Sequence, residues 1–448
     1  MRRKRRQRLP KEPVVLDIEK LSHEGRGIAH LDGKVIFVED ALPSEQVSAV
    51  YTQRRDAFDQ AKTQEIISAS PFRVEPPCEY ARVCGGCSLQ HFEAKQQLAF
   101  KSEVLHELLQ HALADSSYEK LPALEGPLLG YRRKARLAVR YVHKKSQVLI
   151  GFREKSSSFI TVMDHCEVLD ERVSLLLPDL KELIGSLEAY QQIPQIEVAL
   201  GDELDDAPSM ALVFRHLVAL SENDLEKLTA LARERNFALY LQGGGPETVY
   251  KHYPAEGEER LYYALPDYEL RLAFHPMDFT QVNAAINRLM VPKALSLLAL
   301  DQDDTVLDLF CGLGNFTLPA ARTAAQVLGV EGSTDMVDRG RENASRMGLE
   351  NIEFSSADLA TQDQNRPWTG RQFSKILLDP PRSGAIGIIA ELAALKAQRI
   401  VYVSCNPATL ARDAQCFRDN GYRLASAGVM DMFPQTTHVE SIALFLPA

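Results

Sequence analysis

From about residue 270 onward, short apolar runs alternate with stretches of helical length. The apolar runs cover residues 305–310, 327–330, 375–378 and 399–403, and two further candidate strands cover residues 422–429 and 441–446. Parallel strands are buried on both faces and need crossover helices, so this alternation is typical of a parallel sheet with helical connections. We therefore expect an α/β domain over residues 266–448.

The first of these strands runs into a glycine-rich turn at residues 308–316 that precedes a helix. Glycines there let the backbone approach a ligand and leave helix N–H groups available to it. A lone Gly-x-Gly is weak evidence, but Glu331 ends the next strand, where a carboxylate can accept bonds from ribose hydroxyls. Asp358 ends the strand after that and can face an adenine edge. Thr317 replaces the third glycine of the dinucleotide pattern, which favours S-adenosylmethionine over a nicotinamide. The order of a glycine-rich turn, an acid at the next strand end, Asp358 and then Asp-Pro-Pro resembles the class I methyltransferases.

Two motifs at the ends of later strands carry candidate chemistry. Residues 379–382 read Asp-Pro-Pro-Arg, and Cys405 follows the next strand in a Ser-Cys-Asn-Pro turn. Pro407 begins a helix there, and a nearby helix N-terminus is expected to lower the pKa of the thiol. Glu440 precedes the final strand, which in a class I sheet lies beside the strand of Cys405. A thiolate next to a carboxylate suits addition to C6 of a uracil, which activates C5 for methylation, followed by removal of the C5 proton.

At this point the chain resembles the RNA uracil-C5 methyltransferase family. The matching motifs lie at residues 279–283, 308–316, 379–382, 404–407 and 437–440. The resemblance implies that Cys405 is the nucleophile and Glu440 the general base. It also implies S-adenosylmethionine contacts from six side chains, namely Gln281, Phe310, Asn315, Glu331, Asp358 and Asp379, with Phe279 and His438 near the target base.

A cysteine cluster lies upstream of this domain. Cys78, Cys84 and Cys87 fall within ten residues, and Cys166 is the candidate fourth member. Four thiolates suit either zinc or an iron–sulfur cluster, and spacing alone does not separate the two. The resemblance implies a [4Fe–4S] cluster, as in the family members that act on 23S ribosomal RNA. The other cysteines, Cys311 and Cys416, are expected to be structural.

The N-terminal half is organised into smaller parts. Short strands punctuated by glycines over residues 12–70 predict an OB-like β-barrel that resembles the RNA-binding TRAM domain. A basic tail occupies residues 1–11. Residues 71–92 and 125–265 are expected to form an α+β central domain that holds the cluster. A helical segment over residues 93–124 is expected to pack on the catalytic domain.

Composition and charge limit the partners. The net charge is −10, yet seven basic side chains and no acid lie in residues 1–11, which indicates a local contact with a polyanion. A basic stretch at residues 131–136, together with Arg140, Lys144 and Lys145, is a further candidate for phosphate contacts. No apolar run is long enough to cross a membrane.

We therefore expect a cytoplasmic monomer that methylates uracil C5 in 23S ribosomal RNA, at the position-1939 type of site, with no DNA or membrane partner. Three alternatives stay open: a transfer-RNA uracil-C5 methyltransferase, an RNA cytosine-C5 methyltransferase and a non-catalytic RNA-binding protein. Pro381 stands where many cytosine enzymes carry a cysteine, which favours uracil.

Overall fold

The computed structural model describes residues 9–10, 12–203, 208–360 and 365–448. Most of the predicted basic tail, residues 1–8 and 11, therefore lies outside the described residues. The chain forms two compact units. The first comprises Met1–Arg82, Gly86–Val104 and Pro434–Thr437, and the second comprises Val83–Gly85, Leu105–Phe433 and His438–Ala448. None of the helices in the described part of the chain is long and apolar enough to span a membrane.

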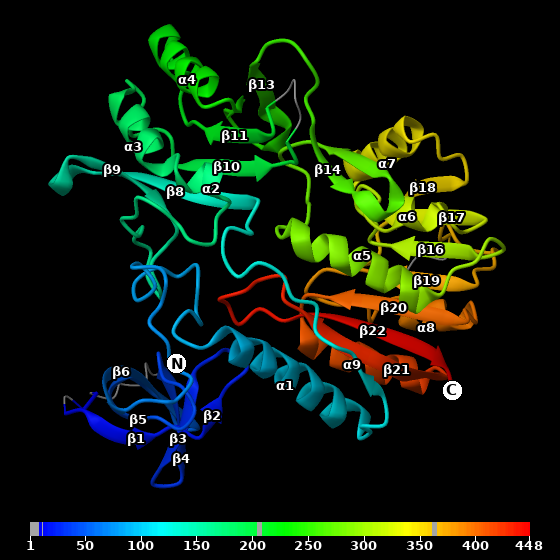
Figure 1. Cartoon of the computed structure of the whole chain (residues 1–448), viewed down its shortest axis with the longest axis horizontal. Coiled ribbons are helices and arrows are strands. Elements are labelled where there is room, and N and C mark those ends of the chain that lie inside the picture. The colour runs from blue at the N-terminus through cyan, green and yellow to red at the C-terminus, as the bar shows by residue number, and fades with distance from the viewer. Residues whose placement is uncertain (1–8, 11, 204–207, 361–364) are drawn as a thin grey trace, which may run out of the picture. The chain divides into compact units, whose positions relative to one another are not determined.

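The first unit contains a six-stranded sheet in the order β1-β5-β6-β4-β3-β2 (blue in Figure 1). Its strands are β1 (Val14–Asp17), β2 (Lys20–Leu21), β3 (Gly27–Leu31), β4 (Lys34–Glu39), β5 (Gln46–Arg54) and β6 (Phe58–Ser68). Alternate side chains of these strands point inward, as a strand that is buried on one face requires. Ile36, Val38 and Val47 are almost fully buried in this core, so the predicted strands are present.

Helix α1 (Ala94–Leu113) follows and is shorter than the helical segment predicted over residues 93–124. It ends because Ala114 adopts a left-handed φ of 47° and Asp115 then accepts a hydrogen bond from Ser117 N at 2.8 Å. These are the geometry and the side chain of a turn rather than of a continuing helix.

A second six-stranded sheet, in the order β13-β12-β11-β10-β8-β9, occupies the middle of the second unit. Its strands are β8 (Lys134–Val142), β9 (Gln147–Gly151), β10 (Gln195–Leu200), β11 (Met210–Arg215), β12 (Ala238–Gln242) and β13 (Val249–Tyr253). Helices α3 (Leu177–Ser186) and α4 (Glu222–Glu234) lie along one side of it, and the short helix α2 spans Glu171–Ser174 (Figure 1). Ser221 caps α4, because its Oγ accepts a bond from Asp224 N at 3.2 Å.

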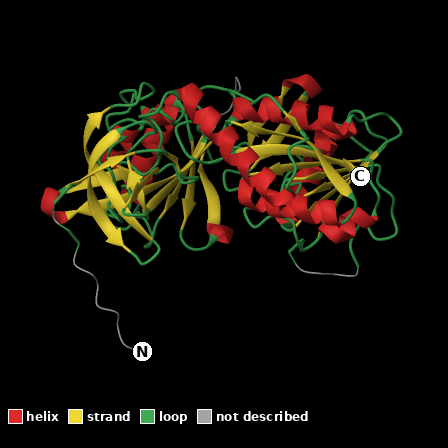
Figure 2. Ribbon diagram, turned by 90° about the horizontal axis from the view of Figure 1, so that it is seen from below, coloured by secondary structure: helices red, strands yellow, loops and turns green. Residues whose placement is uncertain are grey.

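The C-terminal sheet has eight strands in the order β18-β17-β16-β19-β20-β22-β21-β7, and helices cover both of its faces (Figure 2). A hairpin of β14 (Leu261–Leu265) and β15 (Leu270–Phe274) precedes it. The strands are β7 (Glu119–Lys120), β16 (Thr305–Leu309), β17 (Gln326–Glu331), β18 (Ile352–Ser356), β19 (Lys375–Leu378), β20 (Arg399–Ser404), β21 (Tyr422–Met430) and β22 (Glu440–Pro447). The helices are α5 (Ala284–Leu298), α6 (Thr317–Ala321), α7 (Thr334–Arg346), α8 (Ile389–Ala394) and α9 (Pro407–Asp419).

Strands β16 to β20 of this sheet are parallel, and β22 runs antiparallel to β20. The predicted parallel sheet with crossover helices is therefore present. Its edge strand β7 was not predicted. It pairs with β21 through only two residues, Glu119 and Lys120, which is too short a run to show a strand pattern. The carboxyl ends of β16, β17, β19 and β20 carry the candidate site residues to one edge, where ligands bind in open α/β sheets.

Candidate active site

The glycine-rich turn follows β16 and is conformationally demanding. Gly312 and Gly314 have φ values of 56° and 99°, a region that side chains disfavour. A Cβ atom at Gly314 would lie 3.0 Å from Leu318 Cδ1, so the turn also packs tightly against the next helix. Phe310 is not a glycine, yet its φ is 61°. Strained backbone of this kind persists only where the surroundings hold it, and it often occurs at ligand sites.

Glu331 is the last residue of β17, as predicted. One of its oxygens, Oε2, accepts a bond from Gly312 N at 3.1 Å, and Oε1 accepts bonds from Gly332 N at 2.7 Å and Ser333 N at 3.1 Å. The carboxylate is therefore held between two loops at the carboxyl edge of the sheet. A carboxylate with up to four lone-pair sites still has capacity for ribose hydroxyls.

Asp308 is a functional candidate that the sequence analysis used only as the start of the turn. It is buried on β16, and its Oδ2 accepts a bond from Thr317 Oγ1 at 2.5 Å. Its Oδ1 is buried and has no hydrogen-bond partner within the described residues. Burial raises the pKa of Asp308 to about 7, with Asp379 and Glu331 adding to the effect. The signal that could have identified Asp308 was an acidic residue near the end of an apolar strand, directly before a glycine-rich loop.

The other predicted cofactor contacts differ in the hydrogen bonds that they already make within the protein. Asn315 Oδ1 accepts bonds from Tyr263 Oη and Asn287 Nδ2, each at 3.0 Å, and Asn315 Nδ2 donates to Asn287 Oδ1 at 2.9 Å. Its side chain is therefore already engaged within the protein. Asp358 Oδ1 accepts a bond from Ala360 N at 2.9 Å in an exposed loop. Asp379 lies directly after β19, and its N–H donates to Leu309 O at 3.3 Å.

Cys405 and Glu440 are brought together by the register of two neighbouring strands. Ser404 of β20 pairs with Ser441 of β22 in the antiparallel ladder. The ladder ends at this pair, so Cys405 is the first residue after β20 and Glu440 is the first residue of β22. The carboxylate of Glu440 is near enough to raise the pKa of the Cys405 thiol. The structure therefore brings the predicted nucleophile and base close together at the carboxyl edge of the sheet.

The electrostatics of this pair differ from the expectation for Cys405. Burial raises the pKa of the Cys405 thiol to about 11, and the carboxylates of Glu440 and Asp379 raise it further, while Arg382 opposes them. The prediction that a helix N-terminus lowers this pKa is therefore wrong for the protein by itself. The sequence placed both carboxylates near Cys405, but it did not show the burial of the thiol, which is the largest cause of the raised pKa. Burial also raises the pKa of Asp379 to about 7 and that of Glu440 to about 8.

The positive charge of Arg382 opposes the rise in the pKa values of Cys405 and Glu440. Its backbone oxygen accepts a bond from Asn406 Nδ2 at 3.1 Å, and Asn406 also caps α9 by accepting from Ala408 N. Its Nη2 lies 3.4 Å from His438 Nδ1. The loops that follow β19 and β20 are thus joined around Cys405, with Arg382 and His438 beside it.

The four cysteines of the predicted cluster are all buried, at 7–9% exposure. Cys78 N donates to Gln90 Oε1 at 3.2 Å, Cys166 N donates to Ser174 Oγ at 2.8 Å, and Cys84 forms a β-bridge with Glu154. Across the described ranges, no set of three or more His, Cys, Asp or Glu side chains is grouped to hold a metal ion. The donor set itself, four buried thiols, has the chemistry that an iron–sulfur cluster requires.

The predicted basic stretch at residues 131–136 is largely neutralised. Arg133 pairs with Asp202 at 2.5 Å, and Arg136 pairs with Glu197 at 2.9 Å. Lys134 turns inward and donates to Asp278 O. Most of this stretch is therefore structural rather than available for phosphates, because acids from β10 and the following loop lie within reach of it.

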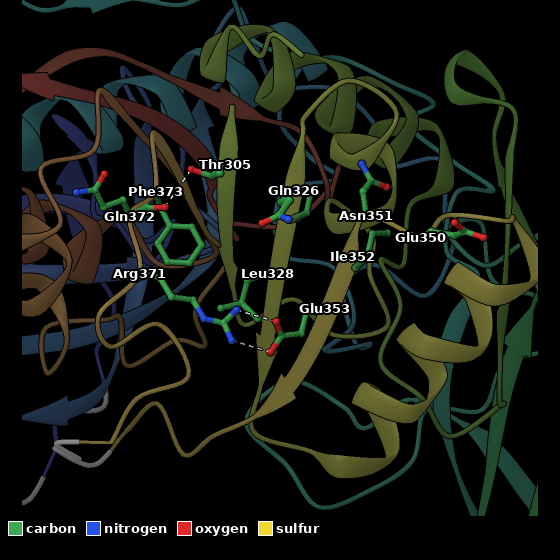
Figure 3. Close-up of a pocket in the computed structure, with 11 residues that line it drawn as sticks. Thr305, Gln326, Leu328, Glu350, Asn351, Ile352, Glu353, Arg371, Gln372 and Phe373 are labelled. Carbon is green, nitrogen blue, oxygen red and sulfur yellow. Dashed lines mark hydrogen bonds and ion pairs between the residues drawn. The ribbon is translucent and has the colours of Figure 1, made fainter. Parts of the chain in front are cut away.

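A hollow of about 420 Å³ lies at the opposite edge of the C-terminal sheet (Figure 3). Its lining residues come from the amino ends of β16, β17 and β18 and from the segment before β19, and they include Thr305, Gln326, Ile352 and Phe373. An exposed ion pair of Arg371 and Glu353 crosses it. Ligands of open α/β sheets bind at the carboxyl ends of the strands, so this hollow is not the expected cofactor site.

The parallel sheet, its strained glycine-rich turn and the acids at its carboxyl edge define a class I methyltransferase. The family model for tRNA (uracil-5-)-methyltransferase matches residues 93–447, and the TRAM domain model matches residues 12–49. The chain belongs to this uracil-C5 methyltransferase family and carries a TRAM domain.

Relatives and a solved structure extend over nearly the whole chain. A protein of Hahella chejuensis named 23S rRNA (uracil(1939)-C(5))-methyltransferase RlmD is 51% identical over 447 residues, 99% of each chain. A protein of the same name from Alcanivorax borkumensis is 52% identical over 442 residues, 99% of this chain and 98% of that one. The crystal structure of Pyrococcus abyssi tRNA (uracil-54, C5)-methyltransferase with S-adenosyl-L-homocysteine has a TM-score of 0.73 at 24% identity. It covers 97% of this chain and 100% of that one.

Proposed function

We propose that this protein methylates C5 of a uridine in 23S ribosomal RNA, the position-1939 type of site, with S-adenosylmethionine as methyl donor. The proximity of Cys405 and Glu440, which adjoin the last paired residues of β20 and β22, carries the chemical part of this proposal. The choice of RNA rests on the relatives named for 23S rRNA, which are about half identical over nearly their full length. The fold alone does not make that choice, since a transfer-RNA enzyme covers 97% of this chain.

The carboxyl edge fits S-adenosylmethionine by its chemistry. Asp308 Oδ1 is a buried acceptor with no partner among the described residues, and the edge gathers three carboxyl groups of raised pKa. Such a site favours a ligand that carries positive charge and hydrogen-bond donors. Six side chains would hold this ligand, namely Gln281, Phe310, Asn315, Glu331, Asp358 and Asp379. When bound, the cofactor supplies an electrophilic methyl group on a positively charged sulfur.

Cys405 begins the reaction by adding its sulfur to C6 of the uracil. The electron pair of the C5–C6 double bond moves into an enolate, and C5 would then attack the methyl carbon while the bond from that carbon to the sulfonium sulfur breaks and leaves a neutral thioether. Because a nearby positive charge favours ionised groups, a bound cation at this edge lowers the pKa of the Cys405 thiol below its value of about 11. A bound cation would thereby raise the fraction of Cys405 that is present as the thiolate.

Glu440 completes the reaction by taking the C5 proton. The electrons of that C–H bond restore the C5–C6 double bond, and Cys405 leaves as a thiolate. A positively charged cofactor at this edge would lower the pKa of Glu440, and loss of that charge on methyl transfer would return the pKa towards its raised value of about 8. The base thus becomes strongest at the step that needs it.

We further propose that Cys78, Cys84, Cys87 and Cys166 hold a [4Fe–4S] cluster. Their spacing and the burial of all four thiols support this assignment. The anaerobically purified protein should contain iron and acid-labile sulfide, and substituting Cys87 by Ser should lower both. A folded, active and colourless protein with stoichiometric zinc would contradict the assignment.

The function is tested by mapping 5-methyluridine in ribosomal and transfer RNA from cells with and without the gene for this protein. We expect loss of the modification at one 23S site with transfer RNA unchanged, and restoration by the wild-type gene but not by the Cys405→Ala variant. Loss from transfer RNA instead would establish the alternative substrate, and loss of a 5-methylcytidine would establish a cytosine enzyme. The monomeric state, the cytoplasmic location and the absence of DNA or membrane partners remain predictions.

A further inference from the structure

The loop between β15 and α5 is fixed at Asp278, the residue before Phe279. Asp278 Oδ2 accepts bonds from His275 N at 2.7 Å and from Arg339 Nε at 3.0 Å, and Asp278 N donates to His275 O at 2.8 Å. The Arg339 and Asp278 side chains are only 12% and 10% exposed. A charged pair with so little water around it and with bonds in good geometry holds its position firmly.

Lys134 completes the bonding of Asp278 from a different sheet. It is the first residue of β8, and its Nζ donates to the backbone oxygen of Asp278. Burial lowers the pKa of Lys134 to about 8, while the charges of Asp278 and Glu197 oppose that effect and Arg136 adds to it. The oxygen that Lys134 binds belongs to the peptide group between Asp278 and Phe279, and a peptide group is planar. Lys134 therefore fixes the direction in which the chain leaves Asp278.

The other end of the same short segment is also fixed. Val282 O accepts a bond from Arg133 N at 2.9 Å, and Asn283 is fully buried and caps α5 by accepting from Ile286 N at 3.2 Å. Only residues 279–281 lie between the two fixed points. Within this segment, Phe279 is 71% exposed, the highest exposure of any large hydrophobic side chain in the described chain. An exposed aromatic on so short and well-held a segment indicates that the fixed backbone presents the segment for contact with another molecule.

We propose that Lys134, Asp278 and Arg339 are positioning residues that hold residues 279–281 in the geometry needed to bind the cofactor. This inference rests on the proposed function, in which Gln281 contacts S-adenosylmethionine. The sequence indicated Lys134 as a candidate for phosphate contacts, whereas its ammonium group binds the backbone oxygen of Asp278 in the catalytic domain. Arg339 lies on α7, a helix of the C-terminal domain, and Lys134 lies on β8 of the second six-stranded sheet. Residues from two parts of the chain therefore hold the same loop.

The test compares binding of S-adenosylhomocysteine to the full-length protein by titration calorimetry. Lys134→Met should weaken binding by on the order of tenfold, because a buried carbonyl loses its partner and the segment loosens. Lys134→Arg should restore most of the affinity. Arg136→Met, two residues along the same strand, is the matched control: its side chain is 67% exposed and pairs with Glu197, so affinity should stay unchanged.

The double variant separates this inference from the function on which it rests. If Lys134 acts through Gln281, then Lys134→Met combined with Gln281→Ala should bind no more weakly than Gln281→Ala alone. Full additivity of the two losses, or wild-type affinity of Lys134→Met beside a weakened Gln281→Ala, would overturn the inference and leave the function standing. Normal affinity of Gln281→Ala would instead remove the assigned role of Gln281.

Amide hydrogen exchange gives a readout that does not depend on Gln281. Residues 279–282 should exchange faster in Lys134→Met than in wild type, while Lys134→Arg and Arg136→Met should match wild type. Exchange that is unchanged over this segment in Lys134→Met would show that the lysine does not hold the loop and would also overturn the inference.

Discussion

The two edges of the catalytic sheet are made by the same strands and yet differ in chemistry. At the carboxyl edge, Asp379 and Glu440 are carboxyl groups whose pKa is raised to about 7 and about 8 by burial. At the amino edge, Glu353 lies in the hollow of about 420 Å³, and its pKa is lowered because Arg371 bonds to it (Figure 3). A satisfied, exposed ion pair leaves little to offer a ligand. The comparison teaches that buried acids without a full set of partners mark the site better than a hollow does.

The largest difference between the edges should appear on removing a carboxylate from each. Glu440→Gln should lower turnover by roughly 10²–10⁴-fold, because the base that takes the C5 proton is lost. It should also accumulate a covalent complex with ordinary RNA, visible on a denaturing gel, since Cys405 can still add. Glu353→Gln at the amino edge is the control and should turn over normally. Normal turnover by Glu440→Gln would mean that another group, with His438 the first candidate, removes the proton.

Glycine substitutions should separate the edges by stability and by cofactor binding. Gly314 and Gly348 both have positive φ, but a Cβ at Gly314 would meet Leu318 at 3.0 Å, whereas nothing lies within 4 Å of one at Gly348. Gly348→Ala should therefore lower the free energy of unfolding by about 1 kcal/mol through backbone strain alone. Gly314→Ala should cost about 2–4 kcal/mol and weaken S-adenosylhomocysteine binding, because crowding adds to strain. Equal effects in thermal denaturation and calorimetry would contradict this distinction.

The raised carboxyl pKa values predict a pH dependence of stability in the cofactor-free protein. Asp308, Asp379 and Glu440 hold their protons to about pH 7–8 when folded but lose them near pH 4 when unfolded. The folded state therefore binds more protons in that window, so these groups make stability fall as pH rises from about 4 to about 8. The melting temperature of Glu440→Gln should fall less steeply between pH 5 and pH 8. Parallel melting curves for variant and wild type would contradict the raised pKa.

The smallest effect should come from the ion pair at the amino edge. Arg371 and Glu353 are 45% and 55% exposed, and exposed pairs contribute under about 1 kcal/mol. Arg371→Ala should therefore change the unfolding free energy by less than that amount in a denaturant titration and should leave methylation unchanged. A large loss of activity would show that the hollow in Figure 3 takes part in function.

The sequence predicted the carboxyl edge well where local pattern suffices. The strands were recognisable from apolar runs, and the turn at residues 308–316 from its glycines, because both properties are local. The neighbouring positions of Cys405 and Glu440 followed from the strand order of the fold class, and the register of β20 and β22 places both next to the final pair of one ladder, Ser404 and Ser441. Thirty-four residues separate the two positions in sequence, so no spacing rule could give that register.

The sequence could not show contacts between side chains that lie far apart along the chain. The direction of the Cys405 pKa was predicted wrongly because the burial of the thiol, the largest cause of the shift, depends on the packing of distant segments around it. Asn315 stays a predicted cofactor contact, and only the folded chain shows that its amide is also paired with Asn287 on α5. Lys134 belonged to a stretch that is basic in sequence, and only the folded chain shows that it turns inward to Asp278.

The account rests on Cys405 as the nucleophile, and RNA that carries 5-fluorouridine at the target tests this most directly. Fluorine at C5 lets the thiolate add and the methyl group arrive, but Glu440 then has no proton to remove, so elimination stops. We predict a stable protein–RNA complex on a denaturing gel with wild type, only when S-adenosylmethionine is present, and none with Cys405→Ala. A complex of equal yield with Cys405→Ala, or wild-type turnover of ordinary RNA by that variant, would contradict the account and make Cys405 a structural thiol.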